Sequence, residues 1–286
     1  MRIVFQSLLS ILVLVVTGCS TSQSHMTSPW KLAAETNEEL LELGNGRVHF
    51  RVIHGGSPTI LLESGGGRDA SDWKSLQPEI ARLTGLAVVS YDRPGFGESD
   101  LPSSAYDAAL EMQHLQEGLK RLGLEKQVIL VGHSYGGLLN QYYASQYSRS
   151  VRGVVLIDPG TVEIADAFGG SKAVVKEAEA EVKYDGPEPA PKRILALRRF
   201  FAGYSEAIEI FRSAVFPDLP IIVISAGKPW WPTEEKNKIW RAGHESIVAG
   251  HPNRSLVVAE GSGHIVMADR PDIVLSAITN IVARIH

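Results

Sequence analysis

The chain has 286 residues, of which 44% are hydrophobic and 21% charged, and its formal net charge is −4. Such a composition is typical of a globular protein that can bury a substantial core, as one large α/β domain or two small domains. The slightly negative charge argues against a nucleic-acid-binding protein, which normally presents a basic face.

The first nineteen residues combine a basic start, an apolar run and a cysteine. A short basic start precedes a nearly continuous apolar run from Leu8 to Val16, which is too short to span a membrane. The run ends at Val16-Thr-Gly-Cys19, which is similar to the lipobox of bacterial lipoproteins. The resemblance implies that residues 1–18 are removed and that Cys19 carries a lipid. The alternative is an ordinary secretory signal with an unrelated cysteine.

The rest of the chain alternates short apolar runs with stretches of helical period. Strands are predicted at residues 47–53, 59–63, 86–91, 128–131, 151–157, 220–225 and 255–259. The clearest helices are predicted over residues 109–122 and 271–284. This alternation indicates a mostly parallel sheet covered on both faces, whose ligands bind at the carboxyl ends of the strands.

One of these strands runs directly into the serine turn Gly132-His-Ser-Tyr-Gly-Gly137, and a helical pattern follows. Such a turn forces Ser134 into a strained backbone conformation and lifts its hydroxyl above the sheet edge. Gly132 and Gly136 are expected there because a Cβ at either position would collide across the turn. The alternative is a tight turn without chemistry.

Three motifs follow one another along the chain: Tyr91-Asp-Arg-Pro-Gly-Phe-Gly-Glu-Ser99, the serine turn and Gly261-Ser-Gly-His264. With these motifs in this order, the chain from about residue 47 to the end resembles the α/β-hydrolase superfamily. The resemblance implies the α/β-hydrolase fold, with helices on both faces of the sheet and a helical cap insertion. It also implies that Ser134 is the nucleophile and His264 its base, since the histidine comes last in this superfamily. His244 and His251 rank far below His264.

In this superfamily a third residue, a carboxylate, orients the catalytic histidine. The position of this acid in the chain departs from the common pattern. Many relatives carry it in a Gly-x-x-Asp turn after the cap, where this chain has Gly227-Lys-Pro-Trp230. Others carry it one strand earlier, and here the strand at residues 151–157 ends on Asp158. We favour Asp158, which would accept a hydrogen bond from His264 and fix its tautomer. The alternatives are a capping role for Asp158 and an acid role for Glu234 or Glu235.

Acyl transfer also needs hydrogen-bond donors that stabilise the substrate carbonyl oxygen, which becomes negative during the reaction. The resemblance implies two backbone N–H groups, one of them on Tyr135, directly after the nucleophile. The other follows an early strand, where Glu63-Ser-Gly-Gly-Gly67 puts Gly66 at the donor position. The alternative is a flexible turn without a ligand.

The segment of residues 161–216 breaks the alternation, because it is long, charged and helical in period. We interpret it as a cap over the carboxyl edge of the sheet. The expected divisions are a signal peptide (1–18), a tether (19–30), two parts of the core (31–160 and 217–286) and the cap (161–216).

One helix of this cap carries a broad apolar stripe: Leu197, Phe200, Phe201, Tyr204, Ile208 and Phe211. The stripe predicts an apolar acyl pocket above Ser134. Alternatively, it only joins the cap to the core, and the loop of residues 228–231 sets specificity.

Together these patterns predict a serine hydrolase that cleaves a small carboxylic ester through an acyl-enzyme, with no metal or other cofactor. An amide or peptide hydrolase is the alternative enzyme, because the same three side chains serve either leaving group. If the protein is not an enzyme, the alternative is a non-catalytic ligand-binding or envelope-interaction protein. The expected partners are a small ester or amide and, through Cys19, a membrane of the bacterial cell envelope. No nucleic acid is expected.

Overall fold

The computed structural model describes residues 35–44, 46–181, 184, 186 and 188–285. The predicted signal peptide, the tether and Cys19 lie outside these residues.

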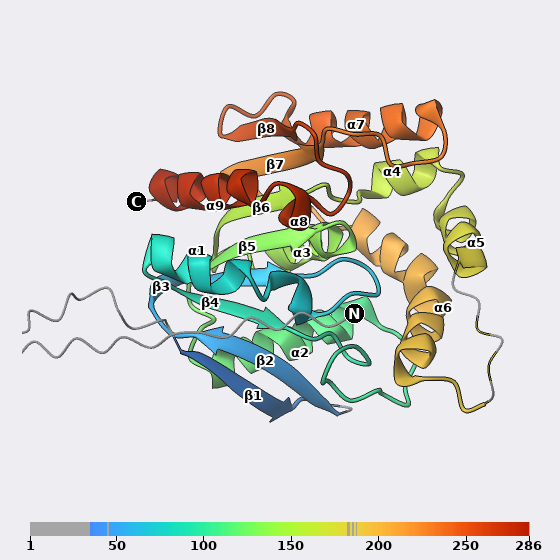
Figure 1. Cartoon of the computed structure of the whole chain (residues 1–286), viewed down its shortest axis with the longest axis horizontal. Helices are drawn as coiled ribbons and strands as arrows, with labels where there is room; N and C mark the ends of the chain where they lie inside the picture. The colour runs from blue at the N-terminus through green and yellow to red at the C-terminus, as the bar shows by residue number, and fades with distance from the viewer. Residues whose placement is uncertain (1–34, 45, 182–183, 185, 187, 286) are drawn as a thin grey trace, which may run out of the picture. The chain divides into compact units, whose positions relative to one another are not determined.

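A mixed sheet forms the centre of the described chain, in the strand order β1-β2-β4-β3-β5-β6-β7-β8 (Figure 1). Its strands are β1 (Thr36–Glu42), β2 (Arg47–Ile53), β3 (Gly56–Glu63), β4 (Leu86–Tyr91), β5 (Val128–His133), β6 (Val151–Ile157), β7 (Ile221–Ala226) and β8 (Arg254–Ala259). The pairs β1–β2 and β2–β4 are antiparallel, and every other neighbouring pair is parallel. The mostly parallel sheet predicted from the sequence is therefore confirmed.

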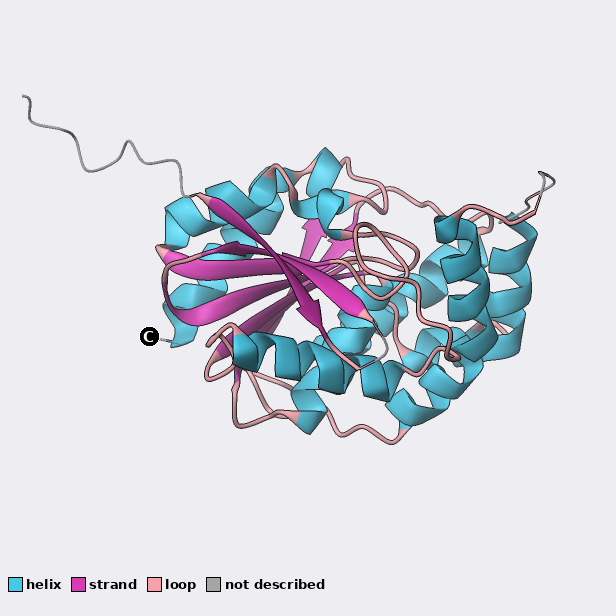
Figure 2. Cartoon of the chain, turned by 90° about the horizontal axis from the view of Figure 1, so that it is seen from below, coloured by secondary structure: helices cyan, strands magenta, loops and turns pink. Residues whose placement is uncertain are grey.

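The sheet lies between two layers of helix, as Figure 2 shows. Helices α1 (Leu76–Thr84) and α9 (Pro271–Ile285) pack on one face, together with the short α8 (Val266–Asp269). Helices α2 (Ala108–Arg121) and α3 (Tyr135–Gln146) pack on the other. Because both faces are covered, every residue of β4, β5 and β7 is buried, which explains their continuous apolar runs.

The last helix illustrates how the sequence pattern produces this packing. Val274, Ile278 and Ile281 recur at spacings of four and three, and all three are fully buried between α9 and the sheet. Burial of each side chain contributes about 1.5–3 kcal/mol relative to its exposure to water. A polar side chain at any of these positions would leave α9 poorly attached.

Three helices follow β6 in the described residues of the segment predicted as a cap. They are α4 (Val162–Ala167), α5 (Ser171–Glu181) and α6 (Lys192–Arg212). Helix α6 buries part of its apolar stripe against α3, where Phe200 lies edge-on to Tyr135 and Phe211 lies beside Tyr142. The chain then returns to the sheet through β7 and continues with α7 (Glu234–Val248).

Candidate active site

The serine turn has the geometry that its glycines predict. Ser134 stands between β5 and α3 with a φ of 54°. A Cβ on Gly132 would lie 2.4 Å from the Asn140 side chain, and one on Gly136 would lie 2.5 Å from the carbonyl oxygen of Ser64. Both distances are too short for any side chain, so both positions require glycine.

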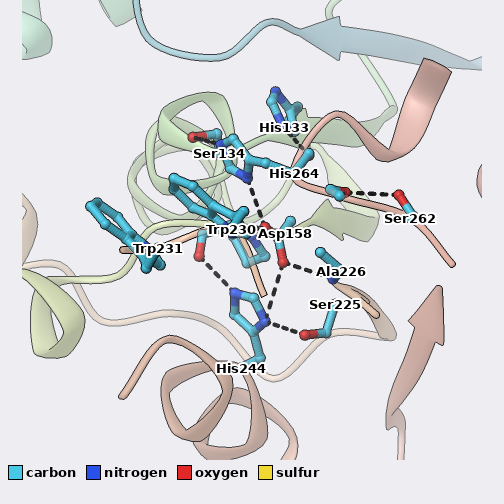
Figure 3. A network of polar contacts seen from close by, with 12 residues as sticks. His133, Ser134, Asp158, Ser225, Ala226, Trp230, Trp231, His244, Ser262 and His264 are labelled. Atoms are coloured by element: carbon cyan, nitrogen blue, oxygen red, sulfur yellow. Dashed lines mark hydrogen bonds and ion pairs between the residues drawn. The ribbon is translucent and has the colours of Figure 1, made fainter. Parts of the chain in front are cut away.

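Three side chains that are distant in sequence form one chain of hydrogen bonds at the carboxyl edge of the sheet (Figure 3). Ser134 Oγ lies 3.0 Å from His264 Nε2, and His264 Nδ1 lies 2.7 Å from Asp158 Oδ2. Because a carboxylate only accepts, Nδ1 carries the proton and Nε2 is free to accept from the serine hydroxyl. This arrangement can transfer the Ser134 proton to His264 while Asp158 holds the ring.

Backbone strain singles out two of these residues independently of any motif. Among the described residues, Ser134 and Asp158 are the only non-glycine residues with positive φ, at 54° and 43°. Such conformations cost on the order of 1–3 kcal/mol and persist mainly at functional sites. The acid candidate thus shares the unusual backbone of the nucleophile candidate.

The Asp158 carboxylate is fully buried, and the described groups that form hydrogen bonds with it are donors. The Ala226 N–H donates to Oδ1 at 2.8 Å, and the Trp230 indole N–H donates to Oδ2 at 3.0 Å. Burial alone would raise the pKa of Asp158, but the hydrogen bonds from His264 and Ala226 hold it below its usual range. Asp158 is therefore an ionised acceptor for His264.

The other carboxylates and the other histidine that the sequence offered as acid or base lie away from Ser134 and His264. Glu234 and Glu235 occupy the exposed first turn of α7, and Glu234 pairs with Lys238. His251 lies beside Asp218, far along the sequence from the serine turn. None of these side chains forms a described contact with Ser134 or His264.

His244 has a structural role that the sequence did not indicate. Its ring is buried beneath the acid, with Nδ1 3.8 Å from Asp158 Oδ1. Nε2 lies 2.9 Å from the carbonyl oxygen of Pro159, and Nδ1 lies 2.9 Å from Ser225 Oγ. Burial lowers its pKa, so the ring is neutral and supports the loop that carries Asp158.

The two predicted oxyanion donors lie side by side. A Cβ placed on Gly66 would lie 3.5 Å from the Tyr135 Cβ. Tyr135 is the first residue of α3, where backbone N–H groups have no partner within the helix. Together with Ser134, both residues line one cavity. Two N–H groups at this place can stabilise a developing negative charge.

A buried ion pair supports the loop that carries Gly66. The Arg93 guanidinium donates to Glu63 and to the carbonyl oxygens of Ser64 and Gly65. Burial raises the pKa of Glu63, whereas Arg93 and Tyr91 act in the opposite direction. The sequence motif contained Arg93, but this role could not be inferred because the partners lie about thirty residues earlier.

The cavity over Ser134 has a volume of about 230 Å³. None of the described residues that line it is charged. Eight of the residues in its wall are aromatic: Tyr135, Phe168, Phe200, Phe201, Tyr204, Trp230, Trp231 and Trp240. The volume exceeds the ~150 Å³ in which an apolar cavity holds benzene. The site can therefore accept an apolar group of medium size.

A larger hollow of about 410 Å³ lies beside Trp230 and Trp240 and reaches Asp158. Neither Ser134 nor Gly66 lines it, and several charged side chains at its rim are exposed. Since Ser134, Gly66 and Tyr135 all line the smaller cavity, any chemistry at Ser134 belongs there.

Known proteins match this architecture. The model of the alpha/beta hydrolase family matches residues 52–277. YqjL, an uncharacterised protein of Bacillus subtilis, is 25% identical over 227 residues, which cover 78% of this chain and 83% of that protein. A proline iminopeptidase of Lactobacillus delbrueckii subsp. lactis is 28% identical over 173 residues, which cover 54% of this chain and 58% of that protein.

A solved structure, that of a probable hydrolytic enzyme from Pseudomonas aeruginosa, superposes with a TM-score of 0.60 at 19% identity. The match covers 88% of this chain and 96% of that one. The family model spans most of the chain, and the sheet order and the solved structure agree with it. The chain therefore belongs to the alpha/beta hydrolase family.

Proposed function

We propose that this hydrolase is a serine esterase that acts through a covalent acyl-enzyme. The observation that carries the proposal is the continuous hydrogen-bond chain from Ser134 through His264 to the buried Asp158. The strained backbone of Ser134 and Asp158 gives independent support.

The positions of these groups support the following reaction. Ser134 Oγ attacks the ester carbonyl carbon as His264 Nε2 takes its proton, and Asp158 stabilises the imidazolium. The carbonyl oxygen becomes negative and accepts hydrogen bonds from the N–H groups of Gly66 and Tyr135. Loss of one such donor typically costs about 10²–10³ in rate.

The tetrahedral intermediate then collapses in the forward direction. His264 gives its proton to the leaving alcohol oxygen, the ester C–O bond breaks, and the acyl group stays on Ser134. Water enters, His264 removes one of its protons, and the hydroxide attacks the acyl carbon. Collapse of the second intermediate releases the carboxylic acid and returns the proton to Ser134.

The lining of the cavity supports a proposal for the substrate class. An uncharged, aromatic wall favours an apolar acyl group, of medium chain length or aromatic, over a charged one. Phe200, Phe201 and Tyr204 come from α6, and Trp230 and Trp231 from the loop after β7. Both regions that the sequence suggested for specificity therefore contribute to the lining.

Amide or peptide hydrolysis is the second candidate, and the similarity to a proline iminopeptidase favours it. The charged amino terminus of a peptide would need a carboxylate partner, and the described lining supplies none. We therefore place the ester first.

Paired assays separate the two. p-Nitrophenyl butyrate and the matching butyryl anilide are offered to the wild type and to Ser134→Ala. The proposal predicts ester hydrolysis that is lost in the variant and exceeds anilide hydrolysis. Preferential anilide cleavage would transfer the assignment to the amidase class, and ester hydrolysis that survives in Ser134→Ala would exclude the mechanism.

We also propose that the enzyme is anchored to the bacterial cell envelope through Cys19. This rests on Val16-Thr-Gly-Cys19, which lies outside the described residues. Within the part of the chain that the structure describes, no helix is long and apolar enough to cross a membrane. Metabolic labelling with palmitate should mark the wild type and not Cys19→Ser. An unlabelled wild type would contradict the anchor and leave the esterase proposal intact.

A further inference from the structure

Trp230 makes two separate contacts with the proposed catalytic groups. Its indole N–H donates to Asp158 Oδ2 at 3.0 Å, and the same oxygen accepts from His264 Nδ1 at 2.7 Å. Its ring also stacks on the His264 imidazole, with the centroids 3.9 Å apart and the planes 21° from parallel (Figure 3). One side chain thus contacts both the acid and the base.

The surrounding structure holds Trp230 in this position. Asn237, on α7, accepts hydrogen bonds from the backbone N–H groups of Trp230 and Trp231 at 3.0 Å each. The Trp230 ring packs against Trp231, with centroids 4.3 Å apart, and edge-on against Trp240 at 5.1 Å. The loop therefore presents the indole in a fixed orientation.

We propose that Trp230 is a positioning residue: its N–H aims Asp158 at His264, and its ring face supports the protonated His264. The inference rests on the proposed function of these groups. A carboxylate with a second donor on Oδ2 cannot rotate away from Nδ1 without losing a buried hydrogen bond. A cation over an indole face is stabilised by the electrons of the ring.

The other titratable groups around His264 do not supply this support. The His133 ring lies 4.6 Å away, and burial lowers its pKa to about 3, so it is neutral. Arg68 acts on His133 in the same direction. His244 is also neutral, and Asp269 accepts from the backbone N–H of Gly263. These groups, together with Asp158, are unchanged when Trp230 alone is replaced.

Replacement by Phe removes the N–H and keeps an aromatic face. Trp231→Phe is the matched control, because it makes the same change in the next residue of the same cavity. The Trp231 indole N–H has no hydrogen-bond partner among the described residues. Activity is expressed per active site, titrated with a fluorophosphonate, so that a loss of folded protein does not count as a loss of turnover.

Trp230→Phe should lower kcat about tenfold to a hundredfold with little change in KM, as expected for one hydrogen bond to a charged group. Trp231→Phe should act mainly on KM. Trp230→Leu also removes the ring face. Relative to Trp230→Phe, the acid limb of its kcat/KM profile should move to lower pH by about half a unit.

A spectroscopic readout does not depend on turnover. The proton between His264 Nδ1 and Asp158 is expected to give a far-downfield ¹H resonance, which should move in Trp230→Phe and stay in Trp231→Phe. An unmoved resonance in Trp230→Phe, or a kcat per titrated site equal to that of the wild type, would overturn the inference. A wild type that does not react with the fluorophosphonate would instead refute the proposed function, and the resonance would still test the positioning of Asp158.

Discussion

Two regions meet over Ser134, and they are built in different ways. The polar edge consists of Ser134, Asp158 and His264, and the first two directly follow β5 and β6. His133 pairs with Ile157 in the parallel register, so the residues after them leave the sheet at the same level. Backbone hydrogen bonds between strands thus place the nucleophile and acid candidates.

The aromatic cover consists of Phe168, Phe200, Phe201, Tyr204, Trp230, Trp231 and Trp240. These side chains come from helices and loops between and after β6 and β7, and none of these seven residues belongs to a strand. The sheet thus places Ser134 and Asp158, whereas the lining that would select a substrate comes from helices and loops outside the sheet.

The largest expected effect lies at the polar edge. Asp158→Asn keeps the shape of the buried side chain but favours the wrong tautomer of His264. It should lower kcat by about 10⁴ while the folded structure is retained. Steady-state kinetics, with circular dichroism for folding, provide the measurement.

Glu234→Gln is the control, since its carboxylate is exposed and paired with Lys238. Near-normal turnover in Asp158→Asn, combined with loss of activity in Glu234→Gln or Glu235→Gln, would assign the acid role to a residue of α7.

A smaller effect is expected where the aromatic cover joins the core. Arg199 of α6 pairs with the buried Glu111 of α2 at 2.7 Å, and burial raises the pKa of Glu111 from 4.5 to about 7. Between these values the folded state holds a proton that the unfolded chain releases. This group's contribution to the free energy of unfolding is therefore present below about pH 4.5 and is lost as the pH rises through about 7.

Glu111→Gln lacks this titration. The wild type should lose about 1–3 kcal/mol relative to the variant between pH 5 and pH 8, measured by urea unfolding. Parallel pH profiles for the two proteins would show that the buried carboxyl does not titrate in this range.

The smallest effect concerns substrate choice. Phe201→Ala and Tyr204→Ala enlarge the cavity without touching the polar edge. In the wild type, kcat/KM for p-nitrophenyl esters should rise by several-fold for each of the first methylenes added to acetate. In the variants, the total increase of kcat/KM over the series should be about tenfold smaller than in the wild type. A chain-length profile that stays the same in folded variants would exclude a cap pocket and leave the polar edge unaffected.

The sequence pattern indicates the geometry of the polar edge more directly than that of the aromatic cover, for a physical reason. Ser134 and its glycines form a local turn, so their spacing alone indicates the geometry.

Strand β1 was not predicted from the sequence, because it is an edge strand with mostly exposed residues and little apolar alternation. Asp158 remained one of several acids, because a carboxylate after a strand can equally cap a helix.

Contacts that depend on distant packing could not be predicted. Trp230 stood out in the sequence only as a departure from the usual aspartate. Its hydrogen bond to Asp158 joins residues 72 positions apart, across the whole segment predicted as a cap. The support of the Gly66 loop by Arg93 likewise requires that β3 and β4 be neighbours in the sheet.

The most direct test of the account is the site of covalent labelling. A fluorophosphonate phosphonylates only a serine whose proton can be removed, so it reports the Ser134–His264 pair itself. After proteolysis and mass spectrometry, the account predicts one adduct, on the peptide that contains Ser134, and its loss in Ser134→Ala and His264→Ala. An unmodified wild type, or an adduct on another residue, would contradict it.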